Sequence, residues 1–72
     1  MNIGLAIKSI AVERGMTAAA LSRATGISEG YLSQLFHAKI EDPQLSKMWA
    51  LSQALGVTVD DMVYRSMEDD AE

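Results

Sequence analysis

The stretch from Thr17 to His37 constrains the fold more than any other part of this 72-residue chain. Gly26 stands where the chain must bend sharply, because glycine adopts positive φ without a steric penalty. Ser28 follows as a candidate N-cap. Apolar residues recur at helical spacing on facing stripes: Leu21 and Ala24 before the turn, Ile27 within it, and Leu32, Leu35 and Phe36 after it. The pattern predicts helices at about 18–25 and 29–37, joined by a tight turn.

Two helices joined in this way form a helix-turn-helix, whose second helix is suited to the major groove of DNA. Its outward face carries candidate base readers: Gln34, Ser33, Glu29 and Gly30. Gln34 is the strongest of them, because its amide can pair in bidentate fashion with adenine N6 and N7. Candidate phosphate contacts surround this face: Thr17, Ser28, Tyr31, His37, Lys39 and Arg23. Lys8 and Lys47 are more distant candidates.

Several of these residues have an equally ordinary structural interpretation. Glu29 can accept from cytosine N4, or it can simply favour the helix start through the helix dipole. Tyr31 can cover the edge of the core, Ser28 can act only as a cap, and His37 and Gln34 can be solvated surface residues. The sequence leaves these alternatives open.

Three more helices are expected, at about 3–14, 44–55 and 59–67, with caps at Asn2 and Thr58 and with Pro43 at the start of the second. In that helix Leu45, Met48, Trp49, Leu51 and Leu55 supply apolar surface. The prediction is an all-α, compact bundle of five short helices. Residues 1–67 form one DNA-binding domain, and residues 68–72 form an acidic, disordered tail.

Composition excludes several classes of protein. With no cysteine and a single histidine, the chain offers no Cys-based zinc site, no metal cluster and no catalytic Ser-His-Asp set, so we expect no cofactor and no enzyme. It shows neither a signal peptide nor a membrane-spanning run, which predicts a soluble, cytoplasmic protein. Its net charge is −4, but four of its ten acidic residues fall in the last five positions. The folded part is then about neutral, which predicts few phosphate contacts.

The layout resembles the lambda-repressor-like, or Cro/XRE, family of helix-turn-helix domains over about residues 3–63. Four segments carry the resemblance: RGMT (14–17), LSRATGIS (21–28), YLSQL (31–35) and ALGVTVDDMV (54–63). The resemblance implies DNA binding in transcription regulation, but phage repressors, Cro proteins, restriction controllers and antitoxins all share this fold.

Three positions depart from the family pattern. An arginine late in the first helix and a glutamate late in the third commonly form an ion pair; Ala11 and Phe36 stand there instead. Losing both charges together avoids an unpaired buried charge, so Phe36 is interpreted as a core residue. Ala18 replaces a phosphate-binding glutamine, and Ala38 replaces a helix-ending glycine, so the third helix is expected to run one residue further.

Family members commonly bind as two-fold dimers to half-sites about one helical turn apart. Surplus apolar residues near the C-terminal end make the candidate dimer interface: Val57, Val59, Met62, Val63, Tyr64 and Met67. The alternative is that the last helix uses them all to close the core. The favoured function is a small homodimeric repressor of Cro-like type that binds an inverted repeat. The other hypothesis is a protein-interaction module of the same fold, an antitoxin or antirepressor.

Overall fold

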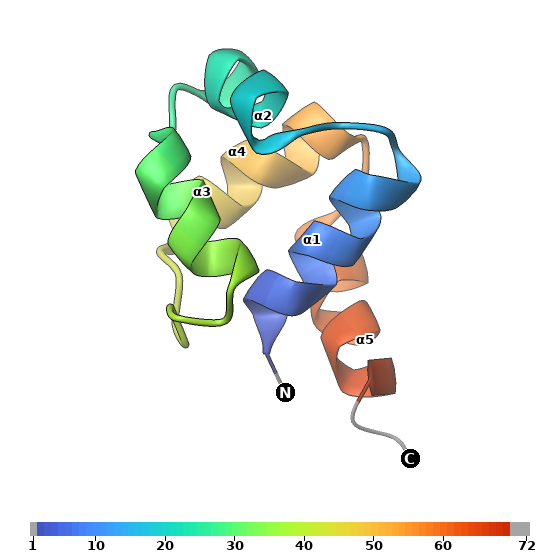
Figure 1. Ribbon diagram of the computed structural model, residues 1–72. Coiled ribbons are helices and arrows are strands. Elements are labelled where there is room, and N and C mark those ends of the chain that lie inside the picture. Colours follow the sequence, from blue (N-terminus) through green and yellow to red (C-terminus); the bar gives the residue numbers. More distant parts are fainter. Residues whose placement is uncertain (1, 70–72) are drawn as a thin grey trace.

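The computed structural model describes residues 2–69, with the side chain of Asp69 left out. This part of the chain folds into five helices: α1 (Ile3–Glu13), α2 (Ala18–Thr25), α3 (Glu29–Phe36), α4 (Leu45–Leu55) and α5 (Val59–Asp69). In Figure 1, α1 lies between α3 and α5, and α4 crosses behind them. α1 packs against both α3 and α5, while α2 packs against α3 and α4. The all-α fold expected from the sequence is confirmed.

Helix starts follow the local chemistry predicted for them. Asn2, Thr17 and Ser28 each accept a hydrogen bond from the backbone N–H three residues later, at 3.0–3.1 Å. At α5 the cap is reciprocal: the Thr58 hydroxyl accepts from the Asp61 N–H at 3.0 Å, and the Asp61 carboxylate accepts from the Thr58 N–H at 2.9 Å. These bonds hold the pKa of the Asp61 carboxyl below its ordinary value.

The core is formed by residues from all five helices and the turn after α2: Ile3, Ile7, Ile10, Ala11, Leu21, Ile27, Leu32, Leu35, Phe36, Leu51, Leu55 and Met62. Ala11 is 1% exposed and Phe36 is 9% exposed. Apolar packing therefore occupies the two positions at which family members commonly form an ion pair. Ala24, in contrast, is exposed and does not face α3 as predicted.

Close contact between α1 and α3 depends on a glycine that the sequence analysis did not single out. A Cβ atom added at Gly4 would lie 2.1 Å from the backbone oxygen of Leu35, near the end of α3. Only a residue without a side chain allows this approach. The first turn of α1 therefore fixes the position of α3.

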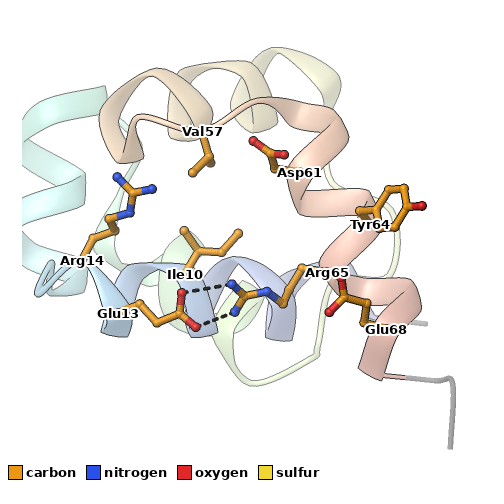
Figure 2. A pocket seen from close by; sticks show the side chains of 8 residues that line it. All are labelled: Ile10, Glu13, Arg14, Val57, Asp61, Tyr64, Arg65 and Glu68. Atoms are coloured by element: carbon orange, nitrogen blue, oxygen red, sulfur yellow. Dashed lines mark hydrogen bonds and ion pairs between the residues drawn. The ribbon is translucent and has the colours of Figure 1, made fainter.

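Arg65 links α5 to α1 through hydrogen bonds and an ion pair. Its guanidinium donates to both carboxylate oxygens of Glu13, at 2.7 and 3.0 Å (Figure 2). It also donates to the Ser9 hydroxyl at 3.1 Å. The hydrogen bonds from Arg65 hold the pKa of the Glu13 carboxyl below its ordinary value. α5 also continues to Asp69, so the first two residues of the expected tail are helical; residues 70–72 lie outside the described part.

Helix ends account for two further corrections. Pro43 does not begin α4: it is buried one position before Gln44, which occupies the N-cap. α3 does not run one residue further either, because Ala38 adopts a left-handed conformation with φ of 61°. Its N–H bonds to the Leu35 carbonyl at 3.2 Å, and the Lys39 N–H bonds to the Gln34 carbonyl at 2.9 Å. Alanine here takes on the strain that glycine would avoid.

Candidate nucleic-acid interface

One face of α3 is buried in the core, and the opposite face is exposed to solvent. Leu32 and Leu35 are 0% exposed and Phe36 is 9% exposed, whereas five residues of the helix and its C-cap point to solvent: Glu29, Gly30, Ser33, Gln34 and His37. Its entry is rigid, because Gly26 ends α2 with φ of 79° and the Thr25 hydroxyl bridges the Leu21 carbonyl and the Ile27 N–H. α3 therefore presents a fixed face to solvent.

The structure brings four predicted contact residues into one place. Ser33, Gln34, His37 and Lys39 line a shallow hollow at the C-terminal half of α3. Ser33 and Gln34 were predicted as base readers, and His37 and Lys39 as phosphate contacts. Their side chains offer an amide, a hydroxyl, an imidazole and an ammonium group within one concave patch, which is a chemistry suited to base edges bordered by phosphate.

His37 is oriented by its own helix. Its Nδ1 lies 2.7 Å from the Ser33 carbonyl oxygen, so the tautomer that donates from Nδ1 is the one this geometry favours. In the neutral ring Nε2 is then an acceptor, suited to a base amino group. In the protonated ring Nε2 becomes a donor, suited to a phosphate. The sequence predicts a phosphate contact or a solvated surface position for His37, and it does not predict a contact with a base.

Tyr31 marks the edge of the interface together with a lysine that sequence reasoning placed too far away. Tyr31 is half-buried against the core, and the Lys47 Nζ lies 4.5 Å from the centre of its ring. Lys47 belongs to α4, so a cation from another helix borders α3. The missing signal is tertiary, since nothing in the local sequence around Lys47 indicates that α4 begins beside Tyr31.

The remaining candidates surround α3 with modest charge. Arg23 is exposed in the last turn of α2, and Lys39 is exposed in the loop after α3. Thr17 and Ser28 use their oxygens as caps, which leaves each hydroxyl proton available to a phosphate. Glu41 and Asp42 are exposed in the following loop and would oppose phosphate there. The interface is therefore close to neutral.

The predicted dimer residues are divided by the structure. Met62 is 0% exposed and belongs to the core, so the prediction that it lies in an interface is wrong. Val57 and Val63 are half-buried against the core, and Val59 is half-buried at the start of α5. Tyr64 and Met67 are 69% and 55% exposed.

Among residues 2–69, no group of histidine and acidic side chains has an arrangement that could hold a metal ion. Within the same residues, no helix is long and apolar enough to cross a membrane.

Comparison with known families identifies this arrangement. The model of the Cro/C1-type HTH DNA-binding domain matches residues 6–67. The chain belongs to this family. Membership indicates a DNA-binding domain of a transcription regulator, and it confirms the family resemblance found in the sequence.

Relatives of this Cro/C1-type domain include solved regulators. The crystal structure of the clp gene regulator ClgR from Corynebacterium glutamicum superposes with a TM-score of 0.88 at 26% identity, covering 94% of this chain and 71% of that one. A chain of the SinR protein/SinI protein complex gives 0.84 at 25% identity, covering 93% and 65%.

Among curated proteins, the trifunctional NAD biosynthesis/regulator protein NadR of Salmonella typhimurium and of Escherichia coli is 39% identical over 51 residues. The match covers 71% of this chain and 12% of NadR. The likeness therefore concerns one part of a much longer protein.

Proposed function

We propose that this domain is a sequence-specific transcription regulator, most like a small Cro-type repressor, that binds an inverted-repeat operator as a homodimer in the cytoplasm. α3 enters the major groove, and Gln34 and Ser33 read base edges. The observation that carries this proposal is the hollow on α3, where Ser33, Gln34, His37 and Lys39 converge on an exposed face whose opposite side is locked into the core.

The test begins with selection of bound sequences from a randomised duplex pool at low and moderate salt. An enriched inverted repeat is the expected result. Against the selected operator, Gln34→Ala should cost about 1–3 kcal/mol of binding and relax the preference at one base position in each half-site. Gln44→Ala is the matched control, because Gln44 is also an exposed glutamine, lies outside α3 and makes no capping hydrogen bond through its side chain. It should leave the base preference unchanged.

A protein-interaction role is the second candidate. It is favoured by the net charge of −4, which is unusual for a DNA-binding protein, and by the likeness to SinR, which was solved in complex with SinI. No enrichment of any sequence, even at low salt where phosphate contacts are strongest, would favour this candidate and contradict the operator-binding proposal.

A further inference from the structure

In the described part of the chain, residues 2–69, two large apolar side chains on the outer face of α4 are exposed to solvent. Leu45 is 70% exposed and Trp49, one turn later on the same face, is 60% exposed. Sequence spacing predicted that both would supply apolar surface to the fold, yet neither is part of the core. Adjacent exposed apolar residues of this size are typical of a protein interface.

A hollow lies directly beside Trp49, where α4 meets α5. It is lined by Trp49, Ser52, Gln53, Val57, Thr58, Val59 and Asp60. A projecting indole and an adjacent recess on one patch are self-complementary: under a two-fold axis, the indole of each copy can enter the recess of the other.

We propose that this α4 edge, defined by Leu45, Trp49 and Val59, is the surface through which two copies of the chain associate. The inference rests on the proposed function, because the homodimer is part of it. Of the interface residues expected from the sequence it keeps Val57 and Val59, and it moves the rest of the contact from α5 to α4.

Charge favours the α4 edge over α5. α4 contains a single ionisable residue, Lys47, and its ammonium group lies over Tyr31. Asp60 is the single ionisable residue among those that line the recess, so the α4 edge brings one carboxylate of each copy into the contact.

On α5, by contrast, Tyr64 stands between acidic residues, with Asp61 one turn before it and Glu68 one turn after it (Figure 2). A two-fold contact centred on Tyr64 would place these carboxylates against their equivalents, and like charges across an interface are unfavourable.

Trp49 is the only tryptophan in the chain, so its fluorescence reports on the α4 edge alone. On raising the protein concentration, we expect its emission to shift to shorter wavelength over the same range in which sedimentation shows the mass doubling. Leu45→Lys should weaken association at least tenfold and abolish that shift. Lysine has a helix propensity close to that of leucine and position 45 is exposed, so the variant should fold with an unchanged circular dichroism spectrum.

Met67→Lys is the matched control, because it introduces the same charge at an exposed apolar residue of α5. It should dimerise like the wild type. Trp49→Ala, followed by sedimentation, tests the same surface without the fluorescent reporter and should also be monomeric.

Three results would overturn the proposal: a wild type that stays monomeric at all concentrations, a Leu45→Lys variant that still dimerises, or a Met67→Lys variant that is monomeric. In the first case, an emission shift that appears when another protein is added would assign the α4 edge to that partner. A monomer that binds single half-sites through Gln34 would leave the DNA-binding function standing while removing the α4 interface. If the protein forms a dimer that Leu45→Lys disrupts but enriches no DNA sequence, the α4 interface stands and the DNA-binding function does not.

Discussion

The contact between Gly4 and Leu35 allows a sharp test of how α3 is held. Replacing Gly4 with alanine adds one methyl group, whose carbon would lie 2.1 Å from the Leu35 carbonyl oxygen and 3.0 Å from its carbonyl carbon. Both atoms are backbone, so no rotamer change relieves the clash. α1 and α3 must move apart, and the fully buried Leu35 side chain must move with them.

The size of the effect follows from two opposed terms. Overpacking a tight core costs about 1–3 kcal/mol, occasionally more, and a contact this short belongs at the upper end. Exchanging glycine for alanine within a helix returns about 1 kcal/mol. We therefore expect Gly4→Ala to lower the free energy of unfolding by about 2 kcal/mol. For a domain of this size that corresponds to a fall in Tm of roughly 8–16 °C.

Urea and thermal unfolding followed by circular dichroism measure this change, with Gly30→Ala as the control. Among residues 2–69, no atom that would crowd the added group lies within 4 Å of a Cβ built at Gly30, so this variant should gain up to about 1 kcal/mol from helix propensity. A Gly4→Ala protein as stable as the wild type would refute the proposed role of this contact in positioning α3.

Three further changes probe helix ends. Ala38→Gly should raise stability by about 0.5–1 kcal/mol in urea unfolding, because it relieves the left-handed φ of 61°; no gain would show that the strain is absent. Ser28→Ala should cost about 1 kcal/mol through loss of the α3 cap, and an unchanged midpoint would argue against that cap. Because the folded-state pKa of Asp61 is lowered, its stabilisation is present above the ordinary carboxyl pKa and is lost as pH falls through roughly 4 and below. Asp61→Asn should therefore flatten the acid limb of a plot of stability against pH, and an unchanged slope would contradict this.

Local signals in the sequence were sufficient for the five helices and for the starts of all but α4. Asn2, Thr17, Ser28 and Thr58 satisfy backbone N–H groups three residues away, so the information lies within a single turn. The outward face of α3 was predictable for the same reason, because once Leu32, Leu35 and Phe36 point inward, Gln34 must point outward.

Features that depend on a second helix were not predictable in this way. Trp49 shares the helical spacing of the buried residues, yet it is 60% exposed, because the packing of the helices and not the spacing decides which face of α4 is covered. Met62 was expected in an interface because nothing local shows that the space beneath it belongs to the core. Gly4 appears ordinary in sequence, since the atom that requires a glycine there, the Leu35 carbonyl oxygen, is 31 positions away.

The scarcity of cations around α3, where Arg23, Lys39 and Lys47 are opposed by Glu41 and Asp42, has a consequence for how such a regulator would search a chromosome. Random DNA holds a protein through phosphates, and each phosphate contact adds to its dwell time there. A regulator of the proposed kind would leave random sequence quickly, so little of it would be sequestered by the bulk of the genome. Occupancy of its operator would follow the free protein concentration closely. The binding free energy lost when one operator base pair is changed would lower that occupancy almost completely in proportion, because little protein is held elsewhere.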